Sequence, residues 1–187
     1  MKLNSADGQV FGAHQRNLEV FSDAFPTAGS TTANEVVNME ENAEVLQLML
    51  QFMHNTRQPD LNKTPFSTLA PLAEAAEKYM IYSAMQICHI HMEFIYFACD
   101  VNLQNDDQTG FFCRRAVEDH PIEVFVYSLK HHHRDLANTS AKLTMSKPTE
   151  DLYRYAREVR LDDSFLLQLV KNSCLNFKTI VLKFLFQ

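Results

Sequence analysis

Glycine and tryptophan are scarce in this sequence: its 187 residues include four glycines and no tryptophan. Phosphate-binding loops need glycines at fixed spacings so that the backbone can approach the phosphate closely. Neither a P-loop nor a dinucleotide-binding fingerprint is present. The scarcity of glycine therefore disfavours nucleotide-dependent enzymes.

The sequence also lacks an excess of positive charge, since 17 basic and 23 acidic residues give a formal net charge of -6. Nucleic-acid-binding proteins need a basic face, so we expect no nucleic-acid partner. No apolar run approaches the roughly 20 residues of a membrane span, and residues 1–9 have no apolar stretch typical of a secretory signal. We expect an intracellular protein, cytoplasmic or nuclear, whose four cysteines are free thiols.

The first periodic segment predicts a helix. His14, Leu18, Ser22 and Phe25 are separated by four, four and three residues, so all four would share one helical face. We predict this helix over residues 15–25, ended by the proline that follows. By its pattern alone it is an ordinary amphipathic helix.

Two segments around this helix have the composition of short strands. Asp7-Gly8 is a turn sequence, so it predicts a tight turn between two strands. The first would be cut short within residues 1–6, and the second would cover residues 9–13. Residues 35–39 contain two β-branched valines and predict a third strand.

A buried helix is predicted after the third strand. Asn42 is a favourable N-cap, and Glu44 suits the positive end of the helix dipole. Apolar residues occur nearly all round the segment 45–53, which is typical of a central, buried helix.

Further helix starts are marked by caps and prolines. Thr64-Pro65 combines a cap with a first-turn proline. Pro71 lies inside the helix that follows and would cost about 3 kcal/mol there, so we expect a kink or a true start near Ala70. Ser83 is predicted to cap the next helix, and Pro121 to open another.

In this order, the segments resemble a BTB/POZ domain. The resemblance rests on FGAHQRNLEVFSDAF (11–25), NEVVNMEENAEVLQLMLQFMH (34–54) and LAPLAEAAEKYMIYSAMQICHIHM (69–92). A fourth segment, HPIEVFVYSLKHHHRDLANTSAKLTM (120–145), is similar to the helical extension of fungal BTB proteins, the mushroom-type ones in particular.

The resemblance implies an α+β fold. A cluster of helices would be flanked by a small sheet, shortened here at its N-terminus, and followed by a C-terminal helical extension. It also implies a protein-binding role without catalysis. BTB domains commonly form homodimers, and many bring partners to cullin-type ubiquitin ligases or to transcriptional complexes.

In the family, the dimer surface uses the first helix and often an exchanged N-terminal strand. Carried over by position, the dimer contact would be formed by Leu18, Val20, Phe21 and Phe25. His14 and Ser22 would support the fold. The alternative for Leu18 and Phe25 is that they belong to the core, because a periodic stripe does not show which side faces a partner.

Two parts of the chain depart from the family pattern. We expect a BTB/POZ-like domain over residues 1–98, a doubtful insert or loop over 99–115, a helical extension over 116–160 and a tail of uncertain status over 161–187. The sequence Phe-Phe-Cys-Arg at 111–114 can be encoded by a pyrimidine tract followed by CAGG, so we interpret residues 93–115 as translated intron. If it is genuine protein, residues 102–110 should form a mobile loop. The tail is predicted to pack on the domain or to be aberrant, and a membrane-surface helix is the less favoured alternative.

Metal-ligating residues occur without the spacing of a zinc site. Cys88 and His91 would share a helical face, but Cys99 and Cys113 are fourteen residues apart. A structural zinc site needs four ligands, usually in short paired spacings. The consecutive histidines 131–133 would point in different directions. We therefore expect no metal and no cofactor.

Catalytic signatures are absent from the sequence as well. An apolar helical face around Cys88 would raise its thiol pKa and suppress its reactivity. Neither G-x-S-x-G nor H-E-x-x-H occurs, and the paired acids Glu40-Glu41 and Asp162-Asp163 are interpreted as solvated turns or helix starts. We expect no enzyme.

The predicted function is therefore that of a protein–protein interaction module. Homodimerisation is its default mechanism, and an adaptor role toward a cullin-type scaffold or a transcriptional complex follows from the resemblance. Two alternatives stay open. The first is a paralogue without activity, which is either degenerate or translated from an incorrect gene structure. The second and less favoured alternative is a zinc-binding protein.

Overall fold

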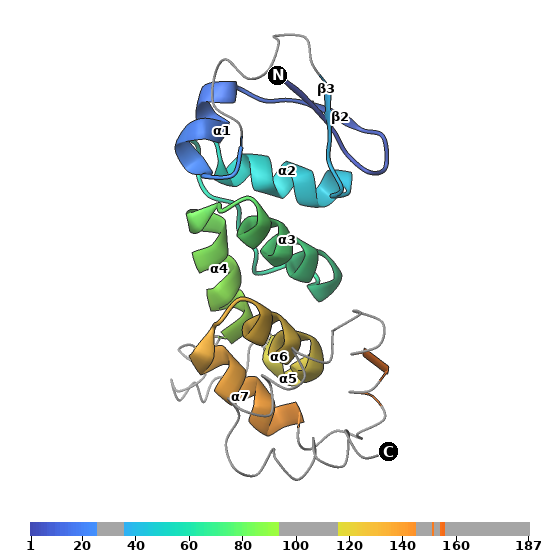
Figure 1. Ribbon diagram of the computed structural model, residues 1–187, viewed down its shortest axis with the longest axis vertical. Helices are drawn as coiled ribbons and strands as arrows, with labels where there is room; N and C mark the ends of the chain where they lie inside the picture. Colours follow the sequence, from blue (N-terminus) through green and yellow to red (C-terminus); the bar gives the residue numbers. More distant parts are fainter. Residues whose placement is uncertain (26–35, 94–115, 145–150, 152–153, 156–187) are drawn as a thin grey trace, which may run out of the picture. The chain divides into compact units, whose positions relative to one another are not determined.

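The computed structural model describes residues 1–25, 36–93, 116–144, 151 and 154–155 of the chain (Figure 1). The chain divides into two compact units, Met1–Cys113 and Arg114–Gln187. Within the described residues, the first unit holds three strands and four helices, and the second holds three helices. The predicted α+β class is therefore confirmed. None of the helices in this described part is long and apolar enough to cross a membrane.

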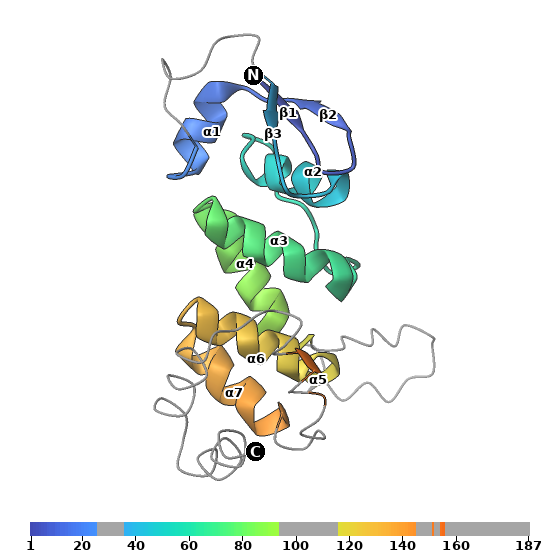
Figure 2. The same ribbon diagram turned by 45° about the vertical axis from the view of Figure 1, so that its right-hand side comes forward.

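The three strands form one small sheet in the order β2-β1-β3. β1 (Lys2–Asn4) pairs antiparallel with β2 (Val10–Gly12) and parallel with β3 (Val36–Asn38). Figure 2 shows the strands side by side next to α2. The turn between β1 and β2 contains Gly8 at a φ of 85°, a conformation that side chains other than hydrogen disfavour. The short first strand and the turn at Asp7-Gly8 are as predicted.

The helix α2 (Ala43–Phe52) forms the centre of the first unit. Its five buried residues are Val45, Leu46, Met49, Leu50 and Phe52. Asn42 caps it by accepting a hydrogen bond from the Val45 amide at 2.9 Å. The carboxylate of Asp7, from the β1–β2 turn, accepts a second bond from the Ala43 amide at 3.0 Å. Because two first-turn amides receive partners, the start of α2 is fixed to the sheet as well as to its own cap.

The helix α1 (Gln15–Phe21) is shorter than predicted. It ends at Phe21, and Ser22 has an extended backbone with φ -144° and ψ 133°. The Ser22 hydroxyl donates a hydrogen bond to the backbone carbonyl of Tyr79, far along the chain. The prediction that this helix extends to residue 25 is therefore wrong, and so is the prediction that His14, Leu18, Ser22 and Phe25 share one helical face. The tertiary hydrogen bond of Ser22 ends the helix before the proline.

Two further helices lie in the described part of the first unit. α3 (Phe66–Lys78) packs against α2 and against α4 (Tyr82–Glu93). α3 begins after Pro65 and continues through Pro71, so the alternative start near Ala70 is wrong. α4 begins at Tyr82, which places Ser83 in its first turn and not at its cap.

The turn between α3 and α4 has a left-handed residue that is not glycine. Met80 has a φ of 51°. The Ile81 amide donates to the Ala76 carbonyl at 2.9 Å, and the Met80 amide donates to the Glu77 carbonyl at 3.2 Å. This pair of bonds is the Schellman motif, which usually has glycine at the position of Met80.

The second unit contains α5 (Ala116–Asp119), α6 (Pro121–Lys130) and α7 (Arg134–Thr144). Pro121 occupies the first turn of α6, as predicted. The α6–α7 turn repeats the Schellman motif with His132 at a φ of 61°, since the His133 amide donates to the Ser128 carbonyl at 2.8 Å. The Thr144 hydroxyl joins the end of α7 to the Pro121 carbonyl at 3.1 Å. The predicted loop over 102–110 and the whole of the tail over 161–187 lie outside the described residues.

Candidate protein interaction site

The residues predicted at a dimer contact have different surroundings in the structure. Leu18 is 1% exposed and Phe25 is 8% exposed, so both are packed within their own chain. Val20 is 68% exposed on α1, and Phe21, at the end of the helix, is partly exposed. The apolar surface that α1 offers to a partner is therefore narrowed to Val20 and Phe21.

The segment after α1 is fastened to the end of α3. The rings of Phe25 and Tyr79 are stacked, with centroids 5.0 Å apart and planes inclined by 20°. The Ser22 side chain is buried and hydrogen-bonded to the Tyr79 carbonyl, as described above. The Tyr82 hydroxyl donates to the Asp23 carboxylate at 2.8 Å. Three successive contacts thus hold residues 22–25 against the α3–α4 turn.

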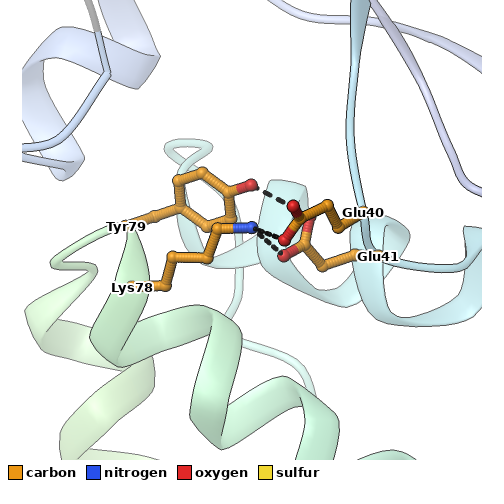
Figure 3. A network of polar contacts seen from close by, with 4 residues as sticks. All are labelled: Glu40, Glu41, Lys78 and Tyr79. Carbon is orange, nitrogen blue, oxygen red and sulfur yellow. Dashed lines mark hydrogen bonds and ion pairs between the residues drawn. The ribbon is translucent and has the colours of Figure 1, made fainter.

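A polar network joins the same end of α3 to the connection between β3 and α2 (Figure 3). The Lys78 ammonium lies 2.7 Å from the Glu40 carboxylate and 3.0 Å from that of Glu41. The Tyr79 hydroxyl donates to Glu41 at 3.0 Å. The Lys78 Nζ also lies 4.8 Å from the centre of the Tyr79 ring. A cation in the last turn of α3 is further favoured by the helix dipole.

The protonation of this network follows from its contacts. The hydrogen bond and charge of Lys78 hold the pKa of Glu40 below its usual value. Partial burial acts to lower the pKa of Lys78, but its hydrogen bonds to Glu40, Tyr79 and Glu41 outweigh burial and raise it. Burial raises the pKa of Tyr79. At neutral pH Lys78 is therefore an ammonium, Glu40 a carboxylate and Tyr79 a neutral phenol.

The sequence did not indicate this network. The sequence predicts a solvated turn or a helix start at Glu40-Glu41, and the solvated position is wrong for Glu41 because its side chain is only 10% exposed. The partners are separated by 37 and 38 residues, and no local spacing relates them. The adjacent lysine and tyrosine at the end of α3 were the available signal, but they do not reveal what they contact.

The surroundings of Cys88 do not favour a reactive thiol. Burial raises the pKa of the Cys88 thiol to about 12, with a smaller contribution from Glu77, so the thiol is protonated and inert at neutral pH. Burial also lowers the pKa of His91. Among the described residues no group of three or more potential metal ligands is found. Cys99 and Cys113 lie outside those residues.

Comparisons with known proteins identify the first unit. The BTB/POZ domain model matches residues 1–96, which is more than half of the chain. No curated protein matches the sequence. The matched region contains the sheet and the helices α1 to α4 described above. BTB/POZ domains are interaction domains and not catalytic ones. Because the match covers more than half of its residues, the chain belongs to the BTB/POZ domain family.

Proposed function

We propose that this chain, as a BTB/POZ protein–protein interaction module, associates with a second copy of itself through α1. The observation that carries the proposal is the contrast between two residues of this helix. Leu18 is 1% exposed, whereas Val20 is 68% exposed. The helix is therefore fixed to its own core on one side and presents a large apolar side chain on another.

The chemistry of α1 supports a protein partner. The cores of protein interfaces are depleted in charge and enriched in apolar and aromatic residues. Val20 is followed directly by Phe21, which is partly exposed. Burial of one such side chain contributes about 1.5–3 kcal/mol, so these residues can anchor an interface but need further contacts around them.

The sheet limits which form the dimer takes. β1 pairs with β2 on one side and β3 on the other, so its hydrogen-bonding edges are both used within its own chain. An exchange of β1 between copies would have to break these pairs first. The proposed dimer therefore depends on α1 and is weaker than one sealed by an exchanged strand.

Sedimentation equilibrium of the full chain tests the self-association. We expect Val20→Asp to raise the dimer dissociation constant at least about tenfold, since an interface core excludes an unpaired charge. The matched control is Ile90→Asp, which places the same charge at an apolar residue of α4 that is 42% exposed. A monomeric wild-type chain, or equal effects of both substitutions, would refute the proposal.

The wider role proposed is that of an intracellular adaptor, cytoplasmic or nuclear, for a cullin-type ubiquitin ligase or a transcriptional complex. Its support is the family membership alone. Binding of a purified cullin-type scaffold to the immobilised chain would support the ligase role. Failure to bind at micromolar concentrations would refute that role while leaving the self-association to its own test.

A degenerate paralogue predicts a different outcome. β1 has only three residues, which is in line with that alternative. However, Leu3 in β1 and Leu46 and Phe52 in α2 are all fully buried, which supports a folded domain. Cooperative unfolding of the purified full chain is expected, and a chain without a cooperative transition would favour the degenerate paralogue.

A further inference from the structure

Two histidine rings from different elements lie next to each other in the first unit. His14 directly precedes α1, and His54 follows α2. Their ring centroids are 6.5 Å apart, and the planes meet edge to face at 63°. Forty residues separate them, so the fold and not the local sequence brings them together.

The backbone selects the tautomer of His54. Its Nδ1 lies 2.5 Å from the carbonyl oxygen of Leu50. A carbonyl oxygen only accepts, so Nδ1 carries the hydrogen of the neutral ring and Nε2 retains its lone pair. Metal-binding histidines commonly have this arrangement, in which one ring nitrogen donates to a backbone carbonyl and the other binds the ion.

The ring of His14 is not used by the helix that it precedes. His14 occupies the N-cap position of α1, but its side chain makes no capping hydrogen bond. Serine, threonine, asparagine and aspartate are the residues that cap helices effectively. His14 is an exposed residue, so it lies where an ion from solvent can approach.

We propose that His14 and His54 form a two-imidazole site for a divalent transition-metal ion such as Zn²⁺. Zinc binds imidazole nitrogen at about 2.0–2.1 Å, so two rings on one tetrahedral ion have centroids on the order of 5 Å apart. The observed centroids, 6.5 Å apart, would have to approach by about 1.5 Å, which requires the side chain of the exposed residue His14 to turn toward His54. Since the described residues contain no group of three or more ligands, water completes the coordination.

Another pair of histidines provides an internal comparison. The centroids of His131 and His133 are 6.4 Å apart. Both rings contact the ring of Tyr127, at 4.8 and 5.5 Å. That pair is held by aromatic packing within one turn, whereas His14 and His54 join α1 to α2. A metal ion at His14 and His54 would therefore link two elements of the BTB/POZ domain.

NMR of the histidine rings in the full chain, titrated with Zn²⁺ alone, tests the site. We expect the ring signals of His14 and His54 to shift together along one saturation curve. His54→Asn keeps a side-chain amide that can donate to the Leu50 carbonyl but removes the Nε2 ligand. His14→Asn supplies a favourable N-cap and likewise removes the imidazole.

Mutual dependence of the two shifts is the decisive result. Each variant should weaken Zn²⁺ binding at the remaining histidine at least about tenfold, since even outer-shell changes cost 10–100-fold. His131→Asn is the control and should leave both curves unchanged. The proposal is overturned if His14 and His54 titrate with different curves, or if either shifts equally after loss of the other.

Discussion

Phe25 lies flat against Tyr79, with ring centroids 5.0 Å apart and planes inclined by 20°. This stack attaches the segment that follows α1 to the C-terminal end of α3. Through the hydroxyl of Tyr79 it continues to Glu41, at the start of α2. One aromatic pair thus connects three parts of the BTB/POZ domain.

Replacement of Phe25 should reveal the contribution of the stack to stability. We expect Phe25→Ala to lower the free energy of unfolding by about 3 kcal/mol, the lower end for loss of a buried aromatic ring. Tyr79→Phe keeps the ring and loses only the hydroxyl bond, so we expect about 1 kcal/mol. Urea unfolding followed by circular dichroism measures both, and a smaller loss for Phe25→Ala than for Tyr79→Phe would contradict the stack.

Lys78 is expected to contribute more to the stability of the fold than its position at the surface indicates. Lys78→Met leaves the Glu41 carboxylate, whose side chain is 10% exposed, without its cation, and should cost about 1–2 kcal/mol. Glu40 is 88% exposed in its side chain, so Glu40→Gln serves as the control with little expected effect. Thermal unfolding of both variants at low and high salt is the measurement. Equal effects of the two substitutions would show that burial of Glu41 is unimportant.

Met80 should be replaceable by glycine with a gain in stability. A left-handed backbone costs a residue with a side chain about 1–2 kcal/mol, and Met80 has a φ of 51° and is 47% exposed. We expect Met80→Gly to raise the free energy of unfolding by about 1 kcal/mol. Ala70→Gly, within α3, is the control and should lower it by about 1 kcal/mol. Destabilisation by Met80→Gly would mean that the methionine side chain contributes packing that outweighs the strain.

Asp7 should contribute to acid sensitivity. Its hydrogen bonds from Ser5 and from the Ala43 amide hold its pKa below the ordinary value of 3.8. A folded-state pKa below the unfolded one stabilises the protein above the unfolded pKa, and this contribution is lost as the pH falls through the folded value. Asp7→Asn should therefore be less stable than wild type near pH 7. The difference should shrink between about pH 4 and pH 2, and a difference independent of pH would refute the charged cap.

The sequence predicts the elements whose causes are local. The α2 helix was found because Asn42 caps it and apolar residues surround it, and both signals lie within a few residues of the helix itself. The end of α1 was missed because the Ser22 hydroxyl bonds to a carbonyl 57 residues away. The burial of Glu41 was missed for the same reason. At Met80 the usual glycine signal for a helix end is missing, so the fold imposes a conformation that the residue itself does not favour.

The α3–α4 turn at Met80 and the α6–α7 turn at His132 also affect the order in which the chain folds. A glycine at each position would let the turn form in a short peptide before any packing. With side chains present, the left-handed conformation is disfavoured in an isolated segment, so the flanking helices must first meet and bury their faces. Each turn therefore forms as a result of the packing around it and does not nucleate that packing. A peptide that contains only α3, the turn and α4 should not form the pair of packed helices on its own.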